Sequence, residues 1–157
     1  GAGITPIVAN SWMHFMNAEV AVMTGGDPTT ETLAGIRSHL NKVDDISGAP
    51  AMDQAAIDNY IANFVVEWTA ASSLDAKLEL WAEEFWITQR GNGIDAYNSY
   101  RRNGYPKNLQ PMVEPDPGPF PVSMWYPQNY AANNSNVTQK SDLTARVFWN
   151  TNGPAVD

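Results

Sequence analysis

Residues 53–68 read DQAAIDNYIANFVVEW, and they decide the fold class of this chain. Their large apolar side chains recur at i, i+3, i+4 and i+7, which is the spacing of one face of an α-helix. These side chains are Ile57, Tyr60, Ile61, Phe64, Val65 and Trp68. Asp53 precedes the pattern and is a good N-cap, because its carboxylate accepts hydrogen bonds from the first turn of a helix. The stretch therefore predicts an amphipathic helix.

Two helices are predicted before this stretch. Thr5 as N-cap and Pro6 at the first helical position open the first, which runs to the Gly-Gly pair at 25–26. The second opens at Asp27 in the same way and presents one continuous apolar face. That face consists of Leu33, Ile36, Leu40 and Val43. Because the turn between them is so tight, the two helices are expected to form an antiparallel helical hairpin.

Two more helices are predicted after it. Ser73 caps one that turns Leu78, Trp81 and Phe85 inward and runs to Gly91. A shorter helix starts at residues 92–93 and ends at Asn103, where the following glycine can adopt the left-handed conformation that closes a helix. Trp12, Trp68, Trp81 and Trp86 lie at helical spacing and are interpreted as packing residues. The sequence thus predicts a mainly α fold over residues 1–103, within a single region that spans residues 1–157.

Residues 104–157 have a different character. They contain eight of the eleven prolines, which remove backbone donors and disfavour regular structure. They also contain seven aromatic residues, more than a solvated disordered tail would hold. We interpret this part as a long irregular strap whose aromatic side chains pack on the helices, or on a part of the protein outside this chain.

Composition excludes several function classes. The chain has 157 residues, a formal net charge of −8 and no cysteine, so thiolate metal sites are excluded and no basic stripe is available for nucleic acid. His14 and His39 lack the spacing of a zinc site, and no nucleotide-binding or acyl-transfer motif occurs. We expect no cofactor, no metal and no catalytic residue. Glu79, Glu83 and Glu84 are interpreted as a solvated helix face, although two carboxylates are also what glycoside hydrolysis requires.

The candidate ligand-binding residues lie in the strap. Trp125, Tyr126 and Tyr130 are flat aromatic side chains on which the C–H faces of sugars stack, and Asn129 can add amide hydrogen bonds. Residues 133–134 supply two more amides. The alternative is that Trp125 and Tyr126 pin the strap into a groove. Arg101 and the arginine after it are expected to hold the strap through carboxylates or carbonyl groups.

Four stretches together resemble the SusD/RagB family. They read WMHFMNAE at 12–19, WITQRGNGIDAYNSYRRNGYP at 86–106, PVSMWYP at 121–127 with NNSN at 133–136, and LTARVFW at 143–149. The second is long and specific, and all four occur in the family's order. Ser123 departs from the family's usual arginine, and residues 128–130 replace the usual acidic end of that motif.

The resemblance implies the C-terminal part of a mainly α-helical protein built on tetratricopeptide-like helix pairs. It implies a non-catalytic, lipid-anchored protein on the outer face of a Gram-negative outer membrane. Such a protein binds oligosaccharides, or in some cases peptides, and delivers them to a TonB-dependent SusC-like transporter. The lipid anchor and the N-terminal part of the protein would then lie outside this chain. Two alternatives stay open: a tetratricopeptide-like protein-interaction module and a glycoside hydrolase fragment.

Overall fold

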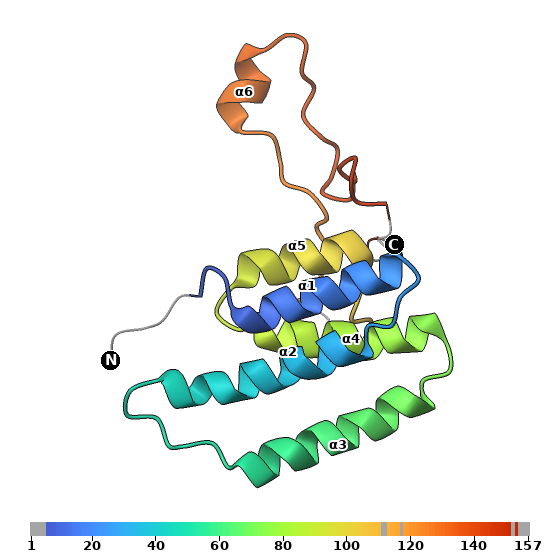
Figure 1. The fold of residues 1–157 in the computed structure, drawn as a ribbon. Helices are drawn as coiled ribbons and strands as arrows, with labels where there is room; N and C mark the ends of the chain where they lie inside the picture. Colours follow the sequence, from blue (N-terminus) through green and yellow to red (C-terminus); the bar gives the residue numbers. More distant parts are fainter. Residues whose placement is uncertain (1–5, 111–112, 117, 152, 154–157) are drawn as a thin grey trace. The chain divides into compact units, whose positions relative to one another are not determined.

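The prediction of a mainly α fold is confirmed by a computed structural model, which describes residues 6–110, 113–116, 118–151 and 153. Those residues include no β-strand. The chain divides into two compact units, residues 1–96 and 97–157, with the division inside a helix. The helices are α1 Asn10–Met23, α2 Thr29–Asn41, the 3-10 helix η1 Lys42–Asp45, α3 Gln54–Ala70, α4 Leu74–Thr88, α5 Gly93–Asn103 and α6 Gln128–Asn133 (Figure 1).

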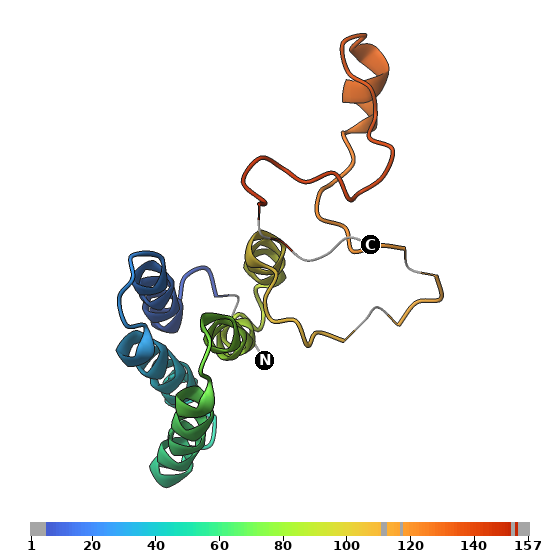
Figure 2. The ribbon, with the colours of Figure 1, turned by 90° about the vertical axis from the view of Figure 1, so that its right-hand side faces the viewer.

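The hairpin of α1 and α2 is the centre of the first unit. Gly25 adopts φ +77° in the turn between them, a left-handed conformation that glycine reaches without strain. Gly35 of α2 faces the ring of Phe15, and a Cβ placed there would lie 2.6 Å from Phe15 Cε2. Any larger side chain at this position would collide with Phe15, so the glycine allows α1 and α2 to approach closely. In both views α2 lies between α1 and α3 (Figures 1 and 2).

Three buried tryptophans connect the helices of this unit through their indole N–H groups. Trp12 of α1 donates to the carbonyl of Thr88 in α4 at 2.9 Å. Trp81 of α4 donates to the carbonyl of Phe15 at 3.2 Å. Trp68 of α3 donates to Thr29 Oγ1 at 2.9 Å. The predicted packing role of these three residues is confirmed, and each hydrogen bond also fixes the rotation of one helix against another.

The predicted caps of α3 and α4 are confirmed. Asp53 Oδ1 accepts from Ala55 N at 2.9 Å, and Ser73 Oγ accepts from Ala76 N at 3.1 Å. Gly104 closes α5 with φ +77°, as its position after the helix predicts. Such positions are encoded locally, because the side chain that caps a helix is adjacent in sequence to the groups it satisfies.

The predicted start of the first helix is wrong. α1 begins at Asn10 instead of at Pro6, and Thr5 lies outside the described residues. Residue 9 carries no capping side chain, so local cap chemistry does not set this boundary. Side-chain burial begins at about the same point, with Ala9, Ser11 and Trp12. Packing against the neighbouring helices therefore overrides the Thr-Pro signal.

The second unit begins with the last two turns of α5. Tyr97 donates its hydroxyl to the carbonyl of Pro121 at 2.6 Å, and its ring lies 5.9 Å from that of Phe120. Val122 and Ser123 are buried in this contact. Among the described residues after Asn103, α6 is the one α-helix, and it lies in a stretch that the sequence predicts to be irregular. Tyr130 N and the following amide both bond to the carbonyl of Pro127, which starts that helical turn.

Candidate functional site

The candidate site lies on an excursion of the chain between residues 124 and 142. Its base is closed by Leu143, whose carbonyl accepts from Val122 N at 3.0 Å and from Ser123 N at 3.1 Å. From this base the chain runs out to α6 and returns (Figures 1 and 2). The excursion thus has two fixed ends, and α6 lies at its far end.

Exposed apolar side chains cluster on the outgoing part of the excursion. Trp125 is 49% exposed, Tyr126 39% and Tyr130 50%, and Met124 is also exposed. The rings of Tyr126 and Tyr130 meet edge to face, with centroids 6.1 Å apart. We call Met124, Trp125, Tyr126 and Tyr130 the aromatic tip. Its rings are open to solvent and have the size and flatness that stacking on a ligand requires.

One amide side chain fixes the shape of the excursion. Gln139 Oε1 accepts from Tyr126 N at 3.0 Å, and Gln139 Nε2 donates to the carbonyl of Tyr126 at 2.9 Å. The same oxygen accepts from Lys140 N at 3.0 Å. The Gln139 side chain therefore replaces the pair of backbone hydrogen bonds that a neighbouring strand would make. We call this pair of contacts the Gln139 clamp.

The sequence-predicted site residues lie together in this region. Tyr126 and Tyr130 are in ring contact, Trp125 precedes them, and Asn129 lies exposed in the first turn of α6. Within the described residues Trp125 and Tyr126 are both exposed, so neither ring is packed into a groove formed by this part of the chain to the point of burial. Asn134 is occupied in the turn after α6, where its side chain accepts from Asn136 N at 3.0 Å.

Sequence reasoning missed two residues of this surface. Gln139 contacts a residue thirteen positions earlier, and Lys140 places its Nζ 5.1 Å from the centroid of the Tyr126 ring. Neither has a local signal, because a glutamine or lysine in a polar loop is ordinary. Their roles follow only from the path of the chain.

Arg101 fastens the second unit together, as its position in the sequence predicts. Its guanidinium donates to the carbonyl of Val122 at 3.1 Å and to Asn98 Oδ1 at 3.0 Å. It also lies over two aromatic rings, 5.0 Å from the centroid of Tyr97 and 4.5 Å from that of Trp149. A planar cation suits this place because it can stack and donate at the same time. The residue supports the base of the excursion and does not face the aromatic tip.

The expectation that Glu84 lies on a solvated helix face is wrong. This residue is 9% exposed, and its Oε1 accepts a 2.6 Å hydrogen bond from the hydroxyl of Tyr60. Burial, and then the nearby charges of Glu83 and Glu67, raise the pKa of Glu84, while the Tyr60 hydrogen bond opposes that rise. Burial and the same hydrogen bond raise the pKa of Tyr60. The pair is a buried polar link between α3 and α4, which helical spacing alone did not reveal.

The two histidines have different surroundings. His14 Nδ1 lies 2.8 Å from Glu31 Oε2, so its partner across the α1–α2 hairpin is a carboxylate. Burial, helped by the charge of Lys42, lowers the pKa of His39. No group of three or more histidine, aspartate or glutamate residues that could hold a metal ion occurs in the part of the chain that the structure describes.

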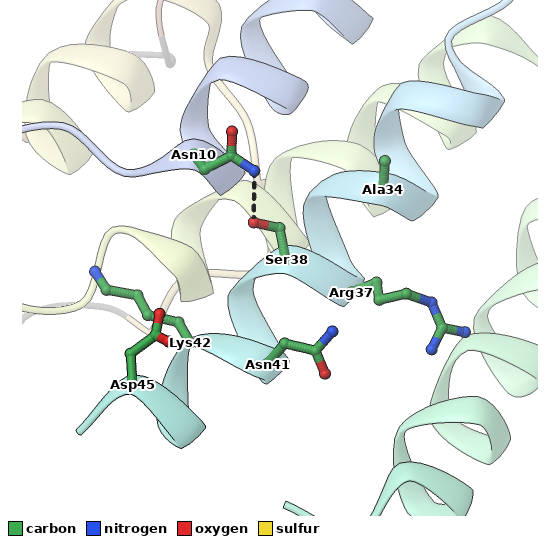
Figure 3. Close-up of a pocket in the computed structure, with 7 residues that line it drawn as sticks. All are labelled: Asn10, Ala34, Arg37, Ser38, Asn41, Lys42 and Asp45. Carbon is green, nitrogen blue, oxygen red and sulfur yellow. Dashed lines mark hydrogen bonds between the residues drawn. The ribbon is translucent and has the colours of Figure 1, made fainter. Parts of the chain in front are cut away.

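A polar pocket opens at the ends of α1 and α2 in the first unit, with a volume of about 490 Å³ (Figure 3). Its lining residues are Asn10, Ala34, Arg37, Ser38, Asn41, Lys42 and Asp45. Asn10 donates to Ser38 at 3.0 Å, and Arg37 is paired with Asp58 of α3 at 2.7 Å. Since these groups are used within the helix bundle and no aromatic residue lines the pocket, it suits a sugar less well than the aromatic tip does.

No helix in the described ranges combines the length and the apolar character needed to cross a bilayer. Comparison of the chain with family models, curated proteins and solved structures found no match.

Proposed function

We propose that this chain is the C-terminal part of a SusD/RagB-like glycan-binding protein, and that the aromatic tip takes part in holding the glycan. One observation carries the proposal: Trp125, Tyr126 and Tyr130 are exposed together on one short segment whose shape the Gln139 clamp fixes. Large aromatic side chains usually become buried when nothing else requires them at the surface. A cluster of them held open favours contact with something outside this chain, and in this proposal that partner is the glycan.

The chemistry of the tip suits a sugar ring. The axial C–H groups of a pyranose form a flat apolar face that packs on an aromatic ring, and its hydroxyl groups need donors and acceptors at the rim. Asn129 provides an amide at this rim, and within the described residues its side chain is not used in another hydrogen bond. Preorganisation adds to affinity, because the Tyr126–Tyr130 contact already holds two of the rings in place.

The helical part supports the same proposal. The stretch at 86–106 that most resembles the family runs from the end of α4 through α5. α1 and α2 form a close helix pair, which in this proposal is one of the tetratricopeptide-like pairs that the family uses. In this proposal residues 104–157 are the strap that follows those pairs. The full protein would be lipid-anchored at the cell surface, would carry no catalytic step and would pass its glycan to a SusC-like transporter.

The proposal is tested with the 157-residue chain on a glycan array, followed by titration calorimetry with the glycans it retains. We expect Trp125→Ala and Tyr130→Ala each to weaken binding about five- to thirtyfold, the loss expected when a stacking ring worth about 1–2 kcal/mol is removed. Phe148→Ala is the matched control, because Phe148 is an aromatic residue of the same unit that is 94% exposed and lies outside the tip.

Three outcomes would count against the proposal: no glycan retained, equal losses in the control and tip variants, or release of reducing ends from a bound glycan. The last would point to the glycoside hydrolase alternative. In that alternative Glu84 would have to leave Tyr60, since its Oε1 is already engaged.

One observation favours a second function, a protein-interaction module. α1 carries an exposed apolar stripe at spacings of three and four residues, one face of a helix: Met13, Met16, Val20 and Met23. A protein that uses this stripe would bind a polypeptide partner and retain no glycan. The array therefore separates the two functions, and Met16→Glu would be neutral for glycan binding in the first of them.

A further inference from the structure

The aromatic tip lies in a stretch that has almost no charge. Between residues 118 and 141 the sequence contains a single charged side chain, Lys140, within a chain whose net charge is −8. No carboxylate occurs in that stretch to repel a negative ligand or to neutralise the lysine. The tip therefore differs electrostatically from the acidic remainder of the protein.

The structure holds this cation beside the site. Lys140 Nζ lies over the ring of Tyr126 at 5.1 Å from its centroid, a cation–π distance. The backbone of the same lysine is tied to the Gln139 clamp through its N–H group. Lys140 thus covers part of Tyr126 and leaves Trp125 and Tyr130 as the rings on which a ligand can stack.

The acidic residue nearest in sequence, Asp142, forms no ion pair with Lys140. Asp142 accepts from Thr144 N at 2.8 Å and from the Thr144 hydroxyl, and its second oxygen accepts from Ser141 at 3.1 Å. Those hydrogen bonds lower the pKa of Asp142, so it stays ionised within its own turn. Within the described residues Lys140 forms no ion pair.

From this geometry we infer that the aromatic tip selects anionic glycans, those built from uronic acids, over neutral ones. The sugar ring stacks on Trp125 or Tyr130 while its carboxylate meets the ammonium group of Lys140. This inference deepens the proposed function and rests on it. A neutral sugar would gain the stacking contact but would leave the cation without a partner.

The experiment uses a matched ligand pair: an oligogalacturonate and the same oligosaccharide after its carboxyl groups have been reduced to alcohols. Affinities of the 157-residue chain for both are measured by calorimetry at low and at moderate salt. We expect the acidic form to bind about two- to fivefold more tightly, the size of an exposed ion pair, and the difference to shrink with salt. Lys140→Gln should remove this preference, so that the acidic and the reduced forms bind with equal affinity.

Lys107→Gln is the control variant. Lys107 also lies over a tyrosine ring, 4.8 Å from the centroid of Tyr105, but outside the tip. The Lys107→Gln variant changes the net charge by the same amount as Lys140→Gln and should keep the preference for the acidic ligand. Equal affinity for both ligand forms, or equal effects of the two variants, would overturn the selectivity and leave glycan binding itself standing. Binding of neither form at any salt would overturn the proposed function together with the inference.

Discussion

Replacing Gly35 by alanine is the sharpest test of how the first unit is packed. The new methyl carbon would lie 2.6, 2.8 and 3.2 Å from three ring carbons of Phe15. Carbon atoms in contact prefer about 3.5–4.0 Å, so the ring or the helix must shift by close to 1 Å. Phe15 is fully buried and stacked on Phe85 at 5.4 Å between centroids, which blocks the simplest movement of the ring.

Two opposing effects set the magnitude. Alanine favours the interior of a helix over glycine by about 0.5–1 kcal/mol. Inserting a methyl group into a packed core costs about 1–3 kcal/mol. Because Phe15 cannot move aside, we expect the packing term to dominate and Gly35→Ala to destabilise the fold by about 1–2 kcal/mol. For a chain of this length the midpoint of thermal unfolding would fall by about 2–8 °C.

The assay is urea and thermal unfolding followed by tryptophan fluorescence and circular dichroism. Gly93→Ala is the matched control, since a Cβ at Gly93 meets nothing within 4 Å, and it should be neutral or slightly stabilising. The double variant Gly35→Ala/Phe15→Leu should lose less stability than the sum of the losses of the two single variants, because the smaller leucine leaves room for the new methyl group. A Gly35→Ala protein as stable as the wild type would refute the close approach of α1 and α2.

Three further predictions concern single interactions. The pKa of Glu84 is raised in the folded protein, so its contribution to stability is present at low pH and is lost as the pH rises through that raised value. The urea concentration at the unfolding midpoint of the wild type should therefore decrease when the pH is raised from 4.5 to 7.5. The urea midpoint of Glu84→Gln should decrease less over the same pH range and should be higher than that of the wild type at pH 7.5. An equal decrease in both proteins would contradict the ionisation of a buried Glu84. Arg101→Met should cost about 1–3 kcal/mol and speed hydrogen exchange at residues 120–123, because the bond to Val122 and two cation–π contacts are lost. Asp53→Ala should cost about 1 kcal/mol by thermal unfolding while Asp53→Asn costs little, since asparagine still accepts from Ala55 N; equal losses would argue against the cap.

Much of the helical fold could be predicted because its signals are local. The caps at Asp53 and Ser73 and the closing glycine at 104 act on groups within a few residues, so the sequence carries them almost completely. The start of α1 failed for the opposite reason. That boundary depends on where Trp12 meets the helix around Thr88, a contact 76 residues away along the chain.

The candidate site was predicted in its residue types but not in its arrangement. Aromatic side chains among prolines drew attention to residues 125–130, whereas their exposure depends on the clamp that Gln139 supplies. Glu84 shows the same limit, since its position on α4 did not indicate that the Tyr60 hydroxyl would donate a hydrogen bond to its carboxylate. Interactions between segments remote in sequence are what periodicity and spacing do not contain.

The Gln139 clamp bears on how this surface can change in evolution. A ladder of backbone hydrogen bonds would impose a fixed register on every residue between its strands, so that an inserted or deleted residue would disturb the whole pairing. Here the spacing between Tyr126 and Gln139 depends on one side-chain amide and on the carbonyl and N–H groups of Tyr126. Residues 127–138, which include α6, can therefore vary in length and composition while the Gln139 clamp is kept. A descendant protein could acquire a new specificity through changes in residues 127–138 alone, with helices α1 to α5 unchanged.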